Sequence, residues 1–120
     1  MKVCVTAAGT EWSAATQPNF GRAQYFLFIE TESEAINAVT NQPGAHGAGV
    51  QAAQTMSEQG AKAVITGSVG PNAYQGLAAA GIDVFVGASG TVREAYDAYR
   101  AGTLKQANAP TGRSHGGGRR

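Results

Sequence analysis

The chain has 120 residues, of which 42% are hydrophobic and 14% are charged, with a formal net charge of +1. This length suits one domain with one modest core, and no apolar run approaches the roughly 18 residues of a membrane-spanning helix. Residues 1–103 hold five basic and eight acidic residues, whereas residues 104–120 hold four basic residues and no acid. Nucleic-acid binding typically needs a basic stripe across a folded face, and this charge distribution does not provide one.

The first third of the chain predicts three strands. Residues 2–7 (KVCVTA) form a short apolar run, typical of a strand buried on both faces. Residues 25–31 (YFLFIET) are aromatic and β-branched, and residues 34–41 (EAINAVTN) follow them at hairpin distance. We therefore expect an antiparallel meander, with a long polar connection over residues 8–24.

Helices and strands alternate over the rest of the chain. Pro71 lies near the expected start of one helix, and Gly102 lies at the expected end of another. Thr91 and Glu94 have the spacing of a capping box. The predicted elements are a helix at 48–60, a strand at 63–66, a helix at 71–80, a strand at 82–86 and a helix at 91–102.

The order β-β-β-α-β-α-β-α predicts an α/β domain over residues 1–103, with helices on a mixed five-strand sheet. Residues 104–120 predict a basic, glycine-rich, disordered tail. The first, third, fourth and fifth strands should run in the same direction, so the loops after them should open at one edge. These four loops are rich in glycine, and ligands of open α/β sheets bind at the carboxyl ends of the strands. They are 7–24, 41–49, 66–72 and 86–91.

Three of these loops lead into helix N-termini, which carry free N–H groups and bind anions. Glycine also lets a backbone approach a ligand closely. We therefore expect a small multi-oxygen or multi-sulfur anion at this edge, although glycines there can also serve turn geometry alone. No phosphate-binding P-loop and no dinucleotide fingerprint is present. The side-chain donors expected at this edge are Arg22, Ser68, Asn72, Ser89 and Thr91.

The sequence lacks a catalytic constellation, so we expect no enzyme. The histidines are His46 and His115, and the acids fall on the expected hairpin and on helix faces. Cys4 and His46 are the obvious candidate metal ligands. Cys4 is better explained as a small hydrophobic residue buried in a strand, and His46 has no second ligand at the spacing that a metal site needs. We therefore predict no conventional metal site. A single cysteine forms no internal disulfide, which favours the cytoplasm.

The segments FGRAQYFLFIET, GAGVQAAQTMSEQGAKAVITGSVGPNAYQGLAAAGIDVF and GTVREAYDAYRAGTL together resemble the dinitrogenase iron–molybdenum cofactor biosynthesis (nitrogenase accessory factor) family. Within it, they are most similar to the orange-protein branch, whose members hold a molybdenum–copper sulfide cluster without covalent attachment. The resemblance covers residues 1 to about 104. It implies a three-layer α/β/α domain with a ribonuclease-H-like motif and a mixed five-strand sheet.

The resemblance also implies cluster-binding positions. Family members that bind the iron–molybdenum cofactor often have histidine just before the Phe-Gly pair, where this chain has Asn19. This difference favours a molybdenum–copper or other cluster over the nitrogenase cofactor. The resemblance and the donor positions together select, as cofactor-binding residues, Asn19, Phe20, Gly21, Arg22, His46, Gly47, Gly49, Gly67, Ser68, Gly70, Pro71 and Asn72.

Two functions remain open from the sequence. The first is a cytoplasmic, non-enzymatic carrier of an anionic metal–sulfur cluster, either molybdenum–copper sulfide or iron–molybdenum type, with protein partners in cluster assembly or delivery and with neither nucleic acid nor membrane as a partner. The second is a metal-free protein-interaction or regulatory module that keeps the same fold. Uptake of a cluster distinguishes the two.

Overall fold

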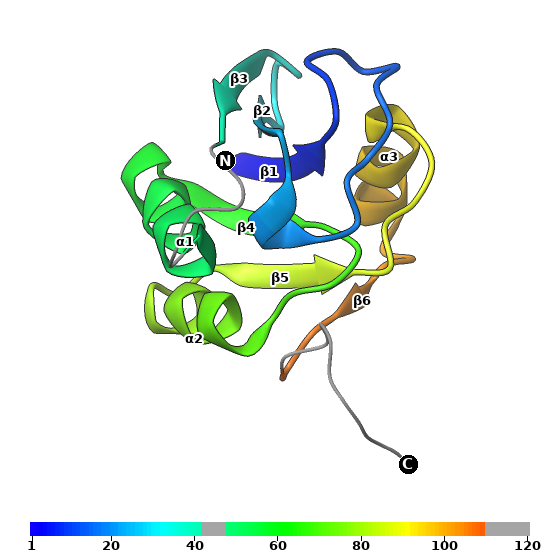
Figure 1. Ribbon diagram of the computed structural model, residues 1–120. Helices are drawn as coiled ribbons and strands as arrows, with labels where there is room; N and C mark the ends of the chain where they lie inside the picture. Colours follow the sequence, from blue (N-terminus) through cyan, green and yellow to red (C-terminus); the bar gives the residue numbers. More distant parts are fainter. Residues whose placement is uncertain (42–47, 110–120) are drawn as a thin grey trace.

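Figure 1 shows the computed structural model, in which residues 1–41 and 48–109 are described. Their backbone forms one mixed sheet with helices on both faces. In chain order the elements are β1 (Lys2–Ala7), the 3-10 turn η1 (Phe20–Arg22), β2 (Tyr25–Glu30), β3 (Ile36–Thr40), α1 (Ala48–Gln59), β4 (Ala61–Ile65), α2 (Pro71–Ala79), β5 (Asp83–Val86), α3 (Val92–Ala101) and β6 (Lys105–Gln106).

The strand order across the sheet is β3-β2-β1-β4-β5-β6. β1 pairs antiparallel with β2, and β2 pairs antiparallel with β3, which confirms the predicted meander. β4 runs parallel to both β1 and β5. The strands β1, β3, β4 and β5 therefore end at the same side of the sheet, as predicted. We call this side the carboxyl edge.

The sheet has six strands, so the prediction of five was wrong. β6 pairs antiparallel with β5, with Lys105 opposite Val86 and Gln106 opposite Phe85. The backbone N–H of Ala107 donates to Val84 O at 2.8 Å, and Ala107 is buried. This strand lies in the segment that we expected to be a disordered tail. Its two side chains are exposed, so no hydrophobic pattern marks it in the sequence. The ribonuclease-H-like motif stays a prediction.

Helices cover both faces of the sheet, so the three-layer α/β/α arrangement is confirmed. In Figure 1, α1 and α2 lie together on one side of the sheet and α3 lies on the other. On the first side, Met56 of α1 and Leu77 of α2 pack over Cys4 and Val64. The two helices approach closely, because a Cβ added at Gly76 would lie 3.0 Å from Cβ of Ala53.

The α3 side has its own buried cluster. Val92 and Tyr96 of α3 pack there against Val5, Leu27 and Ile65 of three adjacent strands. Successive residues of a strand point to opposite faces. Because both faces of the central strands are covered, the sequence of β1 is an almost continuous apolar run. That run is the pattern from which the strand was predicted.

The capping box of α3 is confirmed. Glu94 N donates to Thr91 Oγ1 at 3.1 Å, and Thr91 N donates to Glu94 Oε1 at 2.9 Å. α3 ends at Gly102, whose φ of 77° lies in the left-handed region that favours glycine. Among the described residues, no helix is long and apolar enough to cross a bilayer.

Candidate functional site

The long connection between β1 and β2 has two parts with different partners at the carboxyl edge. Its first part crosses the start of α3, where Thr16 N donates to Gly90 O at 2.9 Å. Its second part, residues 17–22, runs beside the segment that follows β4. The connection, drawn in blue in Figure 1, therefore passes from the α3 side of the sheet to the side of α1 and α2.

The second part pairs with the segment after β4 through its backbone. Ser68 N donates to Pro18 O at 2.7 Å, and Phe20 N donates to Ser68 O at 3.2 Å. Asn19 and Ser68 thus form a short parallel bridge beyond the ends of the strands. The side chain of Ser68 also lies close to that of Asn19, with Oγ 3.3 Å from Oδ1. The structure therefore brings together two segments, 48 residues or more apart, that both contain expected site residues.

Two buried threonines hold this pairing in register. Thr6 is the next-to-last residue of β1, and Thr66 directly follows β4. Both threonines are fully buried. Thr6 Oγ1 donates to Gln17 O at 2.7 Å and lies 2.9 Å from Thr66 Oγ1, which in turn lies 3.4 Å from Pro18 O. A buried hydroxyl that loses its partner is costly. The pair therefore fastens residues 17–18 to the sheet.

Gly67 serves this packing directly. A Cβ added at Gly67 would lie 2.7 Å from Pro18 O and 2.8 Å from Pro18 Cα. Both contacts are to backbone, so a side chain at position 67 would have to displace the loop. One of the glycines expected to approach a ligand thus makes room for another part of the same chain.

The turn η1 is anchored by its aromatic residue. Phe20 is 1% exposed, and its ring stacks on Phe26 with the ring centroids 5.6 Å apart. Its side chain therefore belongs to the core on the α1 and α2 side. Asn41, just after β3, holds the other end of the turn, because its Nδ2 donates to Ala23 O at 2.8 Å and lies 3.4 Å from Gly21 O.

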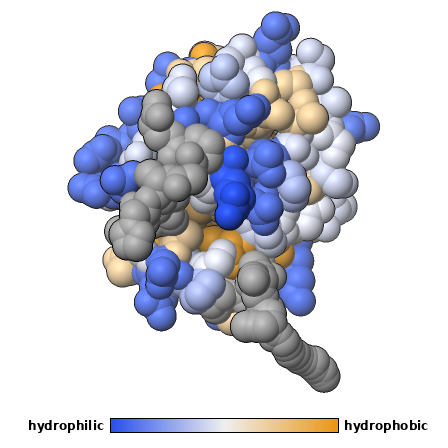
Figure 2. Space-filling view, viewed as in Figure 1, coloured by the Kyte–Doolittle hydropathy of each residue, from blue (hydrophilic) through white to orange (hydrophobic). Residues whose placement is uncertain are grey.

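Arg22 is the cation of this region. It is exposed at the end of η1, and no acceptor or acidic group among the described residues pairs with its guanidinium. Residues 19–22 and 66–73 hold no acid. In Figure 2, hydrophilic residues gather in the middle of the face over which the connection between β1 and β2 passes. The local charge therefore favours an anion.

The N-terminus of α2 follows the segment that pairs with residues 18–20, and its first backbone N–H groups have no partner among the described residues. The N-cap residue, Gly70, has no side chain that could accept a hydrogen bond from the first turn, and Pro71 has no N–H. Among the described residues, no acceptor pairs with the N–H groups of Asn72 and Ala73. No atom of residues 1–41 and 48–109 lies within 4 Å of a Cβ added at Gly70, whose φ of −77° any residue can adopt. Neither backbone strain nor close packing among the described residues therefore requires glycine at position 70.

The N-terminus of α3 is filled by the chain itself, so it adds no free N–H groups to the anion site that we expect at the carboxyl edge. Val92 N donates to Ala14 O at 2.8 Å, and Arg93 N donates to Trp12 O at 3.0 Å. Thr91 is engaged in the capping box. The loop with Ser89 and Thr91 therefore offers no free helix terminus. The path of the first connection decides this, and no local pattern in the sequence predicts that path.

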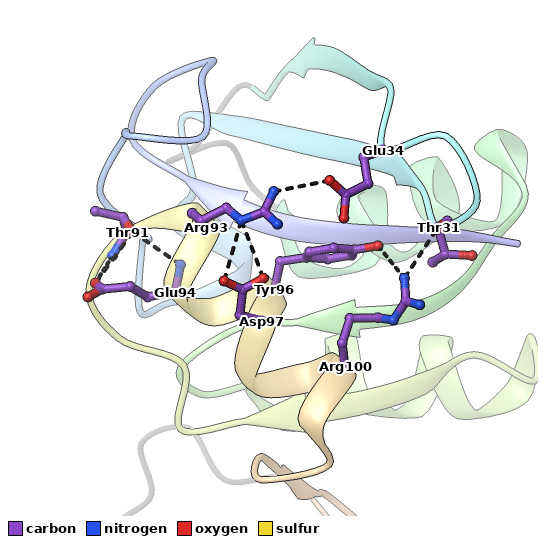
Figure 3. Close-up of polar contacts among 8 residues, drawn as sticks. All are labelled: Thr31, Glu34, Thr91, Arg93, Glu94, Tyr96, Asp97 and Arg100. Carbon is purple, nitrogen blue, oxygen red and sulfur yellow. Dashed lines mark hydrogen bonds and ion pairs between the residues drawn. The ribbon is translucent and has the colours of Figure 1, made fainter.

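The α3 side carries a separate polar network, which Figure 3 shows. Arg93 lies between Glu34 and Asp97, at 3.2 Å and 3.3 Å. The hydrogen bond that Arg93 donates to Glu34, and then the charges of both acids, raise the pKa of Arg93. Arg100 donates to Tyr96 Oη at 2.7 Å and to Thr31 O at 3.1 Å. Exposed pairs of this kind contribute little to stability. Because of these contacts, the guanidinium groups of Arg93 and Arg100 are already paired, unlike that of Arg22.

The expected metal ligands give no site within the described chain. Residues 1–41 and 48–109 contain no group of three His, Cys, Asp or Glu side chains that could hold a metal ion. Cys4 is fully buried in the core on the α1 and α2 side. His46 and Gly47 lie outside the described residues, and Gly49 lies in the first turn of α1. A cluster held by the described residues would thus depend on hydrogen bonds and charge.

Burial raises the pKa of the Cys4 thiol well above its ordinary value. Since the folded pKa is above the unfolded one, the contribution of this thiol to stability is complete below the unfolded pKa and is lost as the pH rises above it. We expect the unfolding free energy of the native chain to fall, relative to Cys4→Ala, by up to about 1.4 kcal/mol per pH unit in the alkaline range. Urea unfolding of both proteins at several pH values measures this. A constant difference between them would contradict it.

Sequence reasoning missed three residues that shape the site. Asn41 was assigned to a strand end and to the loop that follows it but not to the site, and its side chain fixes η1. Thr6 and Thr66 were included in apolar strands, although a polar residue near the end of each of two adjacent buried strands is a usable signal. By contrast, the predicted Asn19, Gly67 and Ser68 do meet, and Arg22, Gly70, Pro71 and Asn72 lie on the segments that follow them.

Comparison with known proteins gives consistent relatives. The family model described as "Dinitrogenase iron-molybdenum cofactor" matches residues 1–102. The apo form of the orange protein from Desulfovibrio gigas superposes with a TM-score of 0.87 at 38% identity, over 92% of this chain and 95% of that one. A Thermotoga protein of the DUF35 family, solved by NMR, gives 0.82 at 35% identity, over 92% and 96%. The uncharacterized protein MJ0580 of Methanocaldococcus jannaschii is 30% identical over 94 residues, 74% of this chain and 80% of its own.

Proposed function

Because this chain belongs to the dinitrogenase iron–molybdenum cofactor family, we propose that it is a non-enzymatic carrier of an anionic metal–sulfur cluster, bound without covalent attachment at the carboxyl edge. The cargo is a molybdenum–copper sulfide cluster or a cluster of the iron–molybdenum type. The carrier works in the cytoplasm and passes its cargo to protein partners in cluster assembly. The similarity to the orange protein over 92% of the chain favours the molybdenum–copper form.

One observation carries the location of the site. Of the helix N-termini of α2 and α3, that of α3 is blocked by Trp12 and Ala14, whereas the N–H groups of Asn72 and Ala73 at the start of α2 have no partner among the described residues. Helix N-termini with free N–H groups stabilise anions. The start of α2 is therefore the place where the edge can receive negative charge.

Neighbouring groups suit the same cargo. Phe20 N and Ser68 O join η1 to the segment that leads into α2, so Arg22 belongs to the same structural unit as Gly70. The guanidinium supplies charge, and the backbone N–H groups supply hydrogen bonds to sulfide. The open space at Gly70 allows a bulky inorganic ion to reach the backbone.

The proposal is tested by reconstitution. The apo chain is titrated anaerobically with tetrathiomolybdate and Cu(I), and the protein is then separated from small molecules by gel filtration. We expect molybdenum and copper to be retained in fixed ratio to protein, with visible sulfide-to-metal absorption. A parallel titration with an isolated iron–molybdenum-type cluster identifies the preferred cargo. If neither metal set is retained, cluster binding fails and the interaction-module function takes its place.

A further inference from the structure

The two edges of the sheet are built differently. β6 closes one edge with only two residues, one of which is Lys105. Short length and lysine are common protections against pairing of an exposed edge with another chain. β3, Ile36–Thr40, forms the other edge with five residues. It has no charged residue and no proline, so it lacks the protection that β6 has.

β3 is also regular and open. Its register with β2 runs without interruption from Ile36 opposite Ile29 to Thr40 opposite Tyr25, so no bulge bends the edge away. In an antiparallel pair, alternate residues direct their N–H and C=O groups away from the neighbouring strand. Among the described residues, β2 is the only strand that pairs with β3. The outward groups of β3 are therefore available to another strand.

We propose that β3 pairs with β3 of a second copy of this chain, antiparallel and with Ala38 of both copies at the two-fold axis. Ala38 is the middle residue of β3, and it is exposed. Its small side chain lets two identical strands approach to the usual spacing. The product is a dimer in which one continuous sheet crosses both copies.

The side chains of β3 suit such symmetric pairing. Around Ala38, Ile36 of one copy meets Thr40 of the other, and Asn37 meets Val39. Ile36 and Val39 are half-buried in the clusters on opposite faces of the sheet, so each face of the junction receives apolar and polar residues in turn. No like charges oppose each other, and like charges opposite each other destabilise strand pairs. Self-pairing therefore meets no electrostatic barrier.

This inference goes beyond the proposed function and does not depend on it. The antiparallel arrangement directs the carboxyl edges of the two copies to opposite sides, so neither copy contributes residues to the site of the other. The contact joins only five residues of each copy, which is less than a standard stable interface provides. We therefore expect a weak dimer that forms between micromolar and millimolar concentrations.

The test uses charges placed at the two-fold axis. Sedimentation equilibrium of the native chain should show reversible dimerisation with rising concentration. Ala38→Lys puts two like charges opposite each other and should leave a monomer, and Ala38→Glu should do the same. An equimolar mixture of the two variants should dimerise again, because Lys then meets Glu. Ala101→Lys, on the exposed end of α3, adds the same charge elsewhere and should dimerise like the native chain.

Several results would overturn the proposal. A native chain that stays monomeric at millimolar concentration has no such contact, even if it pairs with the strand of another protein. A dimer that persists in Ala38→Lys uses another surface. If the mixed variants stay monomeric while circular dichroism shows both folded, the strands do not meet at Ala38. Cluster uptake, measured separately in the monomeric variants, should be unchanged.

Discussion

Replacing Arg22 by alanine is expected to weaken cluster uptake by at least about tenfold while leaving the unfolding free energy unchanged. Removing one charge-assisted hydrogen bond costs about 1.5–3 kcal/mol of binding, and about 1.4 kcal/mol corresponds to a factor of ten. The guanidinium has no partner among the described residues that its removal would leave unpaired. The measurement is an anaerobic titration with tetrathiomolybdate and Cu(I), followed by visible absorption, beside urea unfolding of the same protein.

Two controls separate local charge from net charge. Arg22→Lys keeps the charge and should recover part of the affinity, because lysine lacks the planar fork of donors. Lys62→Ala removes one exposed positive charge from β4 and should leave uptake close to that of the native chain. If Lys62→Ala and Arg22→Ala weaken uptake equally, only the total charge matters. Arg22 would then not belong to the site.

Replacing Gly67 or Gly70 by alanine is expected to weaken uptake in both cases, but only Gly67→Ala should also lower the unfolding free energy substantially. Gly67→Ala forces a methyl group against the backbone of Pro18 and should lower the unfolding free energy by about 1–3 kcal/mol. It should also lower uptake, because the same displacement moves the turn that carries Arg22. Gly70→Ala places its methyl group in open space and should cost at most about 1 kcal/mol, since alanine is a poorer N-cap than glycine.

The decisive comparison is uptake by Gly70→Ala. If a cluster contacts the backbone at the start of α2, the added methyl group should weaken uptake by about tenfold, the equivalent of about 1.4 kcal/mol, in a protein of nearly native stability. Native-like uptake by Gly70→Ala would show that the N-terminus of α2 is not part of the site. A stable Gly67→Ala protein would show that the loop yields more easily than its contacts with Pro18 indicate.

Much of the fold was predictable from local patterns. The apolar run of β1, the aromatic run of β2 and the capping box at Thr91 and Glu94 all depend on residues close together in the chain, and all are confirmed. The common direction of β1, β3, β4 and β5 followed from the order of elements alone. β6 was missed, because its backbone pairing with β5 leaves no pattern in its exposed side chains.

By itself, the sequence determined the order of the elements up to α3. It also determined the edge at which the irregular loops gather and the segments around Arg22 and Gly70 that compose the candidate site. Only the tertiary structure decided which glycine makes room for the chain and which is open, because that depends on Pro18 lying against Gly67. It also decided that the first connection blocks the start of α3, whereas no segment of the described chain blocks the start of α2. Such contacts join residues far apart in the chain, and their geometry arises only when the core that positions both segments has formed.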